Sequence, residues 1–275
     1  MVVKDHAVSL EAFSICRCSS CNFLFTNPRP DQAHIQQYYE SQNYISHKDK
    51  ANNLTNILYK TVRRITIKQK IAWLNQFAKP KGRLLDFGCG TGYFLKAAEK
   101  DGWEVVGYEP NPDAAAIAIR QHHLTILHEY EALELSKKFD AICLFHVLEH
   151  IHDLDGTMQL LLGKLKKRGT LFVAVPNINA YDAQLYKENW AALDVPRHLY
   201  HFTSETMEKF ASVNKLKIRT IKPMVFDSFY VSMLSESYIN SKNKIINSLK
   251  NGFQSNKLAK KENNYSSLLF VLRKA

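Results

Sequence analysis

The chain has 275 residues, of which 45% are hydrophobic, and it carries a formal net charge of +11. This length suits one α/β domain with an appendage, and the hydrophobic share excludes a wholly disordered chain. Its apolar runs are shorter than the ~20 residues that span a bilayer, and residues 1–10 lack the apolar stretch of a secretory signal. Because five cysteines do not suggest a disulfide framework, we expect a cytoplasmic location.

The basic charge lies in the flanks: residues 1–80 carry +6, residues 81–200 carry −3, and residues 201–275 carry +8. Lysine-rich helix faces in contact with water explain this pattern; attraction to an anionic substrate, a membrane surface or nucleic acid is the alternative. No RNA-binding signature or Cys2His2 zinc finger accompanies the charge, which argues against a nucleic-acid partner.

In chain order, an N-terminal segment of residues 1–50 precedes a main domain of residues 51–275. Phe23 to Phe25 predict a short strand, which the following prolines end. Apolar residues at helical spacing then predict a helix from Leu54 to Phe77.

Strands and helices alternate after this helix. The predicted strands are Arg83–Phe87, Glu104–Tyr108, Thr125–Leu127, Phe139–Phe145, Thr170–Val175, Lys217–Lys222 and Ser266–Leu272. The predicted helices are Tyr93–Lys100, 113–121 and Thr157–Lys167, the last with Gly169 as its C-cap. This alternation predicts an α/β, Rossmann-like fold with a seven-stranded, mostly parallel sheet and helices on both faces. A polar insertion, residues 224–263, separates the last two strands.

The glycine loop after the predicted strand Arg83–Phe87 indicates which chemical class of ligand the protein binds. Gly88, Gly90 and Gly92 let the backbone pass close to a bound molecule. A dinucleotide would place its pyrophosphate here, but Asp86 would repel it, and Tyr93 stands where the third glycine of that fingerprint belongs. A ligand with a cationic amino group and no phosphate fits better, as in S-adenosylmethionine. A nicotinamide oxidoreductase is therefore the less favoured interpretation.

Glu109 ends the second strand of this alternation, 21 residues after Gly88. That offset is typical of a carboxylate that accepts hydrogen bonds from ribose hydroxyls, whereas the alternative is a solvent-exposed strand end.

The segment L-L-D-F-G-C-G-T-G followed by V-V-G-Y-E resembles the first two motifs of class I S-adenosylmethionine-dependent methyltransferases. F-D-A-I-C-L-F-H-V-L-E-H-I resembles their fourth-strand motif and is similar to the branch with ubiquinone-biosynthesis O-methyltransferases. The resemblance covers residues 81–222. It extends to C-x-x-C…N-P-R-P upstream and P-R-H-L-Y-H-F-T downstream, which resemble a subgroup of uncharacterised bacterial relatives with an N-terminal zinc-ribbon-like segment. It implies a cofactor site whose methionine end is lined by Asp86, Gly88, Cys89, Gly90 and Gly92. Glu109 would bind the ribose, Pro110 the adenine side, and Phe145 and His146 the reacting end. A looser match puts Glu129 and Tyr130 near the adenine. Cys89 could instead be a reactive thiol.

His146, Glu149 and His150 fall at i, i+3 and i+4, so a helix would place them on adjoining parts of one face. This spacing suits a metal, a general base or structural contacts. Related O-methyltransferases carry Glu where this chain has His146, in a metal-binding E-x-x-E-H arrangement, and we assign no metal here.

Methyl transfer to a hydroxyl requires removal of a proton. His150 and His198 are the candidate catalytic bases, because histidine titrates near neutral pH and both follow strand ends. A pocket-lining role is the alternative for each.

The Cys18–Cys21 knuckle resembles half of a zinc ribbon. Cys16 and His6 could complete four ligands, but a metal-free hairpin is the favoured interpretation.

We therefore expect a methyltransferase that uses S-adenosylmethionine on a small-molecule or carbohydrate-type acceptor, which could be anionic, with O-methylation favoured. The absence of a D/N-P-P-Y motif argues against base N-methylation. The alternative function is a non-catalytic cofactor-binding or nucleic-acid-binding protein, and the sequence does not indicate an oligomeric state.

Residues 1–50 and 224–263 are expected to cover the entrance to the substrate site. Both segments carry aromatic residues that could line it: Tyr38, Tyr39, Tyr44, Phe226, Phe229 and Tyr230.

Overall fold

The computed structural model describes residues 1–39, 54–79 and 81–275; for residues 54–59 it gives the helix but not the side chains. The strands are β1 (Val2–Lys4), β2 (Ala12–Arg17), β3 (Leu24–Thr26), β4 (Arg83–Phe87), β5 (Glu104–Tyr108), β6 (Ile126–Leu127), β7 (Phe139–Phe145), β8 (Leu165–Pro176), β9 (Tyr200–His201), β10 (Leu216–Pro223) and β11 (Ser267–Lys274). The α-helices are α2 (Leu54–Phe77), α3 (Tyr93–Lys100), α4 (Pro112–His122), α5 (Tyr130–Glu134), α6 (Leu154–Lys164), α7 (Tyr181–Tyr186), α8 (Ser204–Val213), α9 (Asp227–Tyr238) and α10 (Lys244–Glu262). Short 3-10 turns are η1 (Ile35–Tyr38), η2 (Leu148–His150), η3 (Lys187–Asn189) and η4 (Ala191–Leu193).

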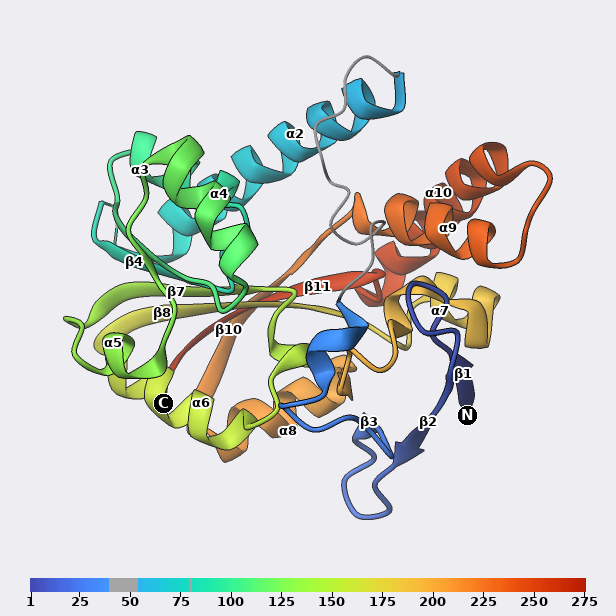
Figure 1. Ribbon diagram of the computed structural model, residues 1–275, viewed down its shortest axis with the longest axis horizontal. Helices are drawn as coiled ribbons and strands as arrows, with labels where there is room; N and C mark the ends of the chain where they lie inside the picture. The colour runs from blue at the N-terminus through green and yellow to red at the C-terminus, as the bar shows by residue number, and fades with distance from the viewer. Residues whose placement is uncertain (40–53, 80) are drawn as a thin grey trace.

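A seven-stranded sheet forms the centre of the molecule, with strand order β10-β11-β8-β7-β4-β5-β6 (Figure 1). Neighbouring strands from β8 to β6 are parallel, and β11 is antiparallel to both β8 and β10. The predicted seven-stranded, mostly parallel sheet is therefore confirmed.

Helices cover both faces of this sheet, and strand residues alternate between the two resulting cores. Ile142 and Leu144 of β7 pack in the core that includes Met158 of α6 and Met207 of α8. Ala141 and Cys143, the alternate residues, face the other core, where the side chains come from α2, α3 and α4. In Figure 1 these three helices lie on one side of the sheet, and α5, α6 and α8 lie on the other.

The predicted boundary between the Lys-rich helix and the next strand is wrong. α6 ends at Lys164, five residues before Gly169, and the chain enters β8 directly at Leu165. Leu165 is fully buried and pairs with Phe139 of β7, so the tertiary pairing outweighs the local preference of the lysines for a helix.

The N-terminal segment forms a small antiparallel sheet of order β1-β2-β3-β9. Its fourth strand, β9, comes from the main domain, and Phe25 pairs there with Tyr200. Val3 and Ile15 are buried in the same apolar cluster as Trp190 and Val231. The described part of the segment thus packs against the part of the main domain that follows β8.

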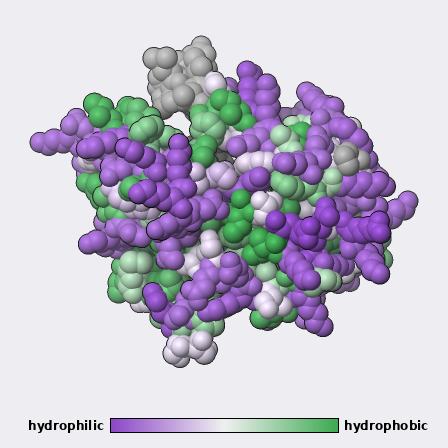
Figure 2. All heavy atoms as spheres, turned by 180° about the vertical axis from the view of Figure 1, so that it is seen from behind, coloured by the Kyte–Doolittle hydropathy of each residue, from purple (hydrophilic) through white to green (hydrophobic). Residues whose placement is uncertain are grey.

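The insertion between the last two strands consists of the helices α9 and α10, which lie side by side above the N-terminal sheet in Figure 1. Hydrophilic side chains cover most of the opposite face of the molecule, with apolar side chains between them (Figure 2).

Candidate functional site

The carboxyl ends of three neighbouring strands, β7, β4 and β5, form the floor of the site. Asp86 near the end of β4 pairs in register with Gly107 of β5 and Cys143 of β7. The chain leaves β4 toward β5 on one side and later returns to β7 on the other. Such a switch point opens a crevice at the strand ends, where ligands of α/β proteins bind.

The glycine loop follows β4, and each of its three glycines has a positive φ: 77° at Gly88, 53° at Gly90 and 80° at Gly92. A Cβ atom at Gly88 would lie 2.5 Å from Val147, and one at Gly92 would lie 2.7 Å from Leu124. At Gly90 a Cβ atom would meet no atom within 4 Å. Two glycines therefore fit the loop against the protein, and Gly90 leaves its outer side open to a ligand.

Glu109, directly after β5, is 8% exposed and lies against this loop. Its carboxylate accepts hydrogen bonds from the backbone N–H of Gly90 at 2.7 Å and of Asn111 at 2.9 Å. Burial raises the pKa of Glu109, while these two bonds act to lower it. The predicted alternative of a solvent-exposed strand end does not hold, because this carboxylate is buried beside the loop.

Lys70 of α2 was missed by the sequence reasoning. Its ammonium lies 4.0 Å from the centre of the Phe145 ring, and it attracts the carboxylates of Asp86 and Asp227. Burial raises the pKa of Asp86 to about 7, although the charge of Lys70 acts to lower it. The apolar periodicity of residues 54–77 predicted that Lys70 lies in a helix but gave no role for it. The one feature that could have identified Lys70 is that it is a charged residue next to the apolar face of that helix.

His146 follows β7 with a φ of 58° and is not part of η2, so no helix runs from His146 to His150 to place the three side chains on one face. Its Nε2 lies 3.1 Å from Asp227 of α9, and its Nδ1 lies 3.6 Å from Glu149. Burial acts to lower the pKa of His146, but these two carboxylates outweigh it and raise the pKa to about 9. His146 is thus an imidazolium between two carboxylates at neutral pH. The sequence did not indicate a role for Asp227 in the site, because Asp227 lies far from His146 in the chain.

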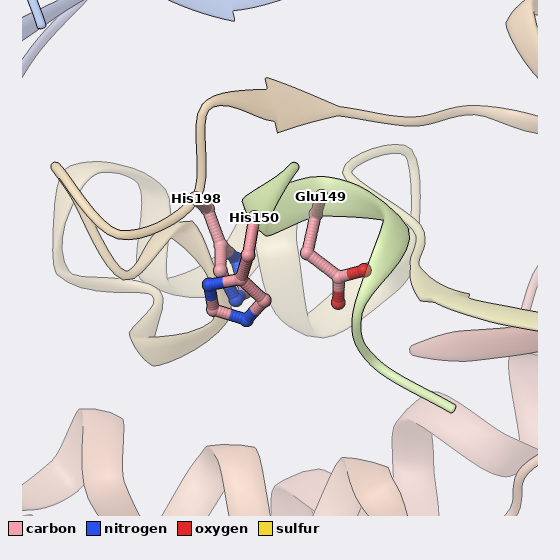
Figure 3. Close-up of side chains that lie close together, drawn as sticks. All are labelled: Glu149, His150 and His198. Carbon is pink, nitrogen blue, oxygen red and sulfur yellow. The ribbon is translucent and has the colours of Figure 1, made fainter. Parts of the chain in front are cut away.

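Glu149, His150 and His198 lie close together and form a cluster (Figure 3). The rings of His150 and His198 lie 4.6 Å apart, edge to face. His150 Nδ1 donates to the carbonyl oxygen of Arg197 at 3.0 Å, and His198 Nδ1 donates to that of Ala192 at 2.8 Å. Because carbonyl oxygens only accept, these bonds leave a lone pair on each Nε2.

The Glu149 carboxylate is fully buried, and neither oxygen has a hydrogen-bond partner among the residues that the structure describes. One ligand atom from each of Glu149, His150 and His198 lies within 4.8 Å of the others. Two imidazole nitrogens with fixed tautomers and one carboxylate without a hydrogen bond among the described residues fit a divalent transition metal. The same groups could also receive a proton, since burial lowers the pKa of His150 to about 4 and keeps its ring neutral.

The N-terminal segment reaches this cluster. The Tyr39 hydroxyl lies 3.0 Å from His150 Nδ1. Arg197, next to His198, is buried and paired with Asp5 at 2.9 Å and Asp194 at 2.7 Å. A buried ion pair therefore joins the first strand to the loop that carries His198.

The remaining predicted site residues lie near these groups. Phe145 is half-buried against Phe94, with ring centres 4.9 Å apart, and Pro110 is exposed beside Glu109. Tyr130 stacks on Tyr108, with ring centres 5.3 Å apart, whereas Glu129 is exposed. Burial raises the pKa of Cys89, which favours a packed thiol over a reactive thiolate.

The N-terminal cysteines gather no further metal ligands from the part of the chain that the structure describes. In residues 1–39, 54–79 and 81–275, the Glu149 cluster is the one group of three that could hold an ion, and Cys16, Cys18, Cys21 and His6 are not in it. The His6 ring instead stacks on Tyr238 at 4.4 Å.

Residues 62–218 match the protein family described as "Methyltransferase domain". This match covers more than half of the chain. The chain belongs to the class I S-adenosylmethionine-dependent methyltransferases.

Ubiquinone biosynthesis O-methyltransferases are distant relatives of this methyltransferase chain. It is 28% identical over 167 residues to the mitochondrial enzyme of Rattus norvegicus, covering 54% of this chain and 48% of the relative. It is 30% identical over 150 residues to that of Brucella ovis, covering 50% of this chain and 60% of the relative. The chain thus spans about half the length of the curated relatives that it matches.

Solved structures share the fold. The magnesium protoporphyrin IX methyltransferase of Synechocystis PCC 6803, with bound SAH, superimposes with a TM-score of 0.59 at 14% identity, covering 89% of this chain and 100% of that one. The cyclopropane synthase MmaA2 of Mycobacterium tuberculosis gives a TM-score of 0.51 at 15% identity, covering 75% and 83%. At these identities the likeness concerns the fold alone.

No helix among the described residues is both long enough and apolar enough to cross a membrane.

Proposed function

We propose that this protein transfers a methyl group from S-adenosylmethionine to a small-molecule or carbohydrate-type acceptor, most readily to a hydroxyl oxygen. The observation that carries the proposal is the convergence of the open side of Gly90, the buried Asp86 and Glu109 beside the loop. In this arrangement Asp86 attracts the amino group of the cofactor, and Glu109 accepts from its ribose hydroxyls. The reducing cytoplasm remains the proposed location, in keeping with five free thiols.

The cofactor supplies a methyl group on a sulfonium, and the acceptor oxygen forms its bond to that carbon as the carbon–sulfur bond breaks. The protein must align the two and receive the proton that the hydroxyl loses. We propose that His150 or His198 receives it, because each presents an Nε2 lone pair and both lie in the cluster of Glu149, whose carboxylate lies 3.6 Å from His146 at the end of β7. Tyr39 and Asp227, from the N-terminal segment and the insertion, would then bound the acceptor side. Tyr44 lies outside the described residues.

The cofactor assignment is tested by calorimetry with S-adenosylhomocysteine and with NAD. We expect binding of the first and not of the second. Glu109→Gln should weaken that binding by about 1–3 kcal/mol, because a charged acceptor is lost. The exposed Glu104→Gln on the same strand is the control and should bind like the wild type. NAD binding without a response to S-adenosylhomocysteine would refute the assignment.

The acceptor is sought with labelled S-adenosylmethionine against fractions of cell extract. With an acceptor in hand, replacing the catalytic base should lower turnover by ~10²–10⁴-fold with cofactor affinity nearly intact. His150→Gln, His198→Gln and the double variant are compared across pH, because paired groups titrate together. Wild-type rates in all three would mean that neither histidine is the base.

A metal in the cluster would change the role of these histidines. Glu149, His150 and His198 would hold the ion, both Nε2 lone pairs would be occupied, and the ion's charge would assist ionisation of the hydroxyl. Metal analysis of the purified protein and of Glu149→Gln separates the two cases. Stoichiometric metal that is lost in Glu149→Gln would exclude the histidines as bases.

A further inference from the structure

The buried face of helix α10 consists of small residues. Its buried positions are Ser248, Gly252, Ser255 and Ala259. A Cβ atom at Gly252 would lie 2.6 Å from the Phe229 ring of α9, so the two helices are in close contact there. The large apolar side chains of α10 are therefore not among its buried positions.

Those large side chains face the solvent. Ile245 is 62% exposed, Ile246 68%, Leu249 53% and Phe253 66%. Residues three, four, seven and eight apart share one helix face, so the four side chains form a continuous apolar stripe. Figure 2 shows apolar side chains among hydrophilic ones at the end of the molecule where α9 and α10 lie. Exposed side chains of this kind are normal when scattered, but a stripe of four marks an interaction surface.

Lysines surround the stripe. Between residues 239 and 262 the chain has six exposed lysines and a single acidic residue, Glu262: Lys242, Lys244, Lys250, Lys257, Lys260 and Lys261. Lys250 and Lys257 follow Ile246 and Phe253 by four residues, which places each lysine beside the stripe. An apolar stripe bordered by lysines, with a bulky aromatic residue on it, is the pattern of helices that lie in a membrane interface.

We propose that α10 docks this stripe onto the surface of an anionic lipid bilayer. The apolar side chains enter the boundary between headgroups and acyl chains, and the lysines pair with anionic headgroups. Charge complementarity selects this partner: a second copy of the chain would bring its own lysines against these, and nucleic acid offers no apolar surface for Ile246 and Phe253. The neighbouring helix, α9, carries Asp227 to His146, so docking would place the acceptor side of the site next to the bilayer.

The test is co-sedimentation with vesicles, without cofactor or acceptor, so that its outcome is independent of the methyltransferase proposal. We expect binding to phosphatidylcholine vesicles that contain phosphatidylglycerol, little binding to phosphatidylcholine alone, and release by salt. The double variant Ile246→Ser/Phe253→Ser should reduce binding by about tenfold or more. Its control is Leu135→Ser, which removes an 89% exposed apolar side chain directly after α5, a helix that lies far from α10 in Figure 1.

The charge contribution is tested with Lys250→Glu/Lys257→Glu, which should also reduce binding by about tenfold or more. Lys100→Glu/Lys217→Glu alters the net charge equally at exposed positions outside α10 and should bind nearly as the wild type does. Circular dichroism of every variant verifies folding. The proposal is overturned if the stripe variants bind vesicles as well as their controls. It is also overturned if sedimentation shows a dimer that Ile246→Ser/Phe253→Ser dissociates, or if DNA binding depends on the lysines and vesicle binding does not.

Discussion

Asp86 sits at the centre of the candidate cofactor site with its charge only partly neutralised. It is 4% exposed, and burial together with the nearby Glu109 raises its pKa, against the pull of Lys70, to about 7. A carboxyl group whose pKa is higher in the folded than in the unfolded state favours folding most below the unfolded value. That contribution is lost as pH rises through about 7, because the buried group must then ionise.

The cationic amino group of a bound cofactor would stabilise the ionised form of Asp86 and so offset the free-energy cost of ionising it in the interior. We therefore expect the affinity for S-adenosylhomocysteine to rise as pH increases from about 5 to 7, by at most tenfold per unit, and then to level off. Asp86→Asn should bind more weakly, and its affinity should change little over that range, because the titrating group is gone. Calorimetry across pH measures both. An affinity of the wild type that does not change over that range would show that Asp86 does not contact the amino group.

At the scale of one element, two glycines of the glycine loop have different roles: Gly88 packs against the protein, and Gly90 leaves space for a ligand. Gly88 and Gly90 both have a positive φ, which costs an L-residue about 1–2 kcal/mol. They differ in what lies beside them, since Gly88 touches Val147 and Gly90 faces open space.

Gly88→Ala should therefore lower the free energy of unfolding by about 2–4 kcal/mol, because overpacking adds to the backbone cost. Gly90→Ala should lower it by only about 1 kcal/mol but weaken S-adenosylhomocysteine binding by about tenfold or more, since its methyl group enters the ligand's space. Urea unfolding and calorimetry on the two variants measure these effects. Equal losses of stability, with cofactor affinity unchanged in Gly90→Ala, would contradict this assignment of the loop.

At the scale of the whole molecule, the N-terminal sheet and the main domain behave as one structure. Asp5 and Arg197 are each 1% exposed, and their ion pair joins β1 to the loop of His198. Arg197 also donates to the carbonyl oxygen of Tyr38 at 2.8 Å. A buried charge that loses its partner is costly.

Asp5→Asn should thus lower the free energy of unfolding by about 2–4 kcal/mol. The decrease is smaller than for a buried charge with no partner, because Arg197 still pairs with Asp194. Urea unfolding followed by tryptophan fluorescence measures the change. Asp31→Asn is the matched control: its exposed carboxylate pairs with the exposed His34 at the surface, so stability should stay at the wild-type value. If both variants unfold alike, the N-terminal sheet is not coupled to the domain through this pair.

Much of the fold follows from the sequence alone. The bounds of β4, β5, β7, α2 and α3 agree with prediction, because apolar periodicity and the glycine loop act over a few residues. The family and the placement of Gly88, Gly90 and Glu109 follow from the same local pattern. The end of α6 was misplaced, since the pairing of Leu165 with Phe139 depends on a neighbouring strand.

Only the tertiary structure brought distant residues together. It set His198 against His150, and it placed Lys70 beside Asp86 and Asp227 beside His146. It also left the apolar stripe of α10 in solvent, although the sequence of that helix would suit a buried face equally well. These contacts join side chains far apart in the chain, and local spacing carries no information about which helix covers which strand end. The physical reason is that such proximity results from the packing of whole elements around a shared core, which is a property of the complete chain.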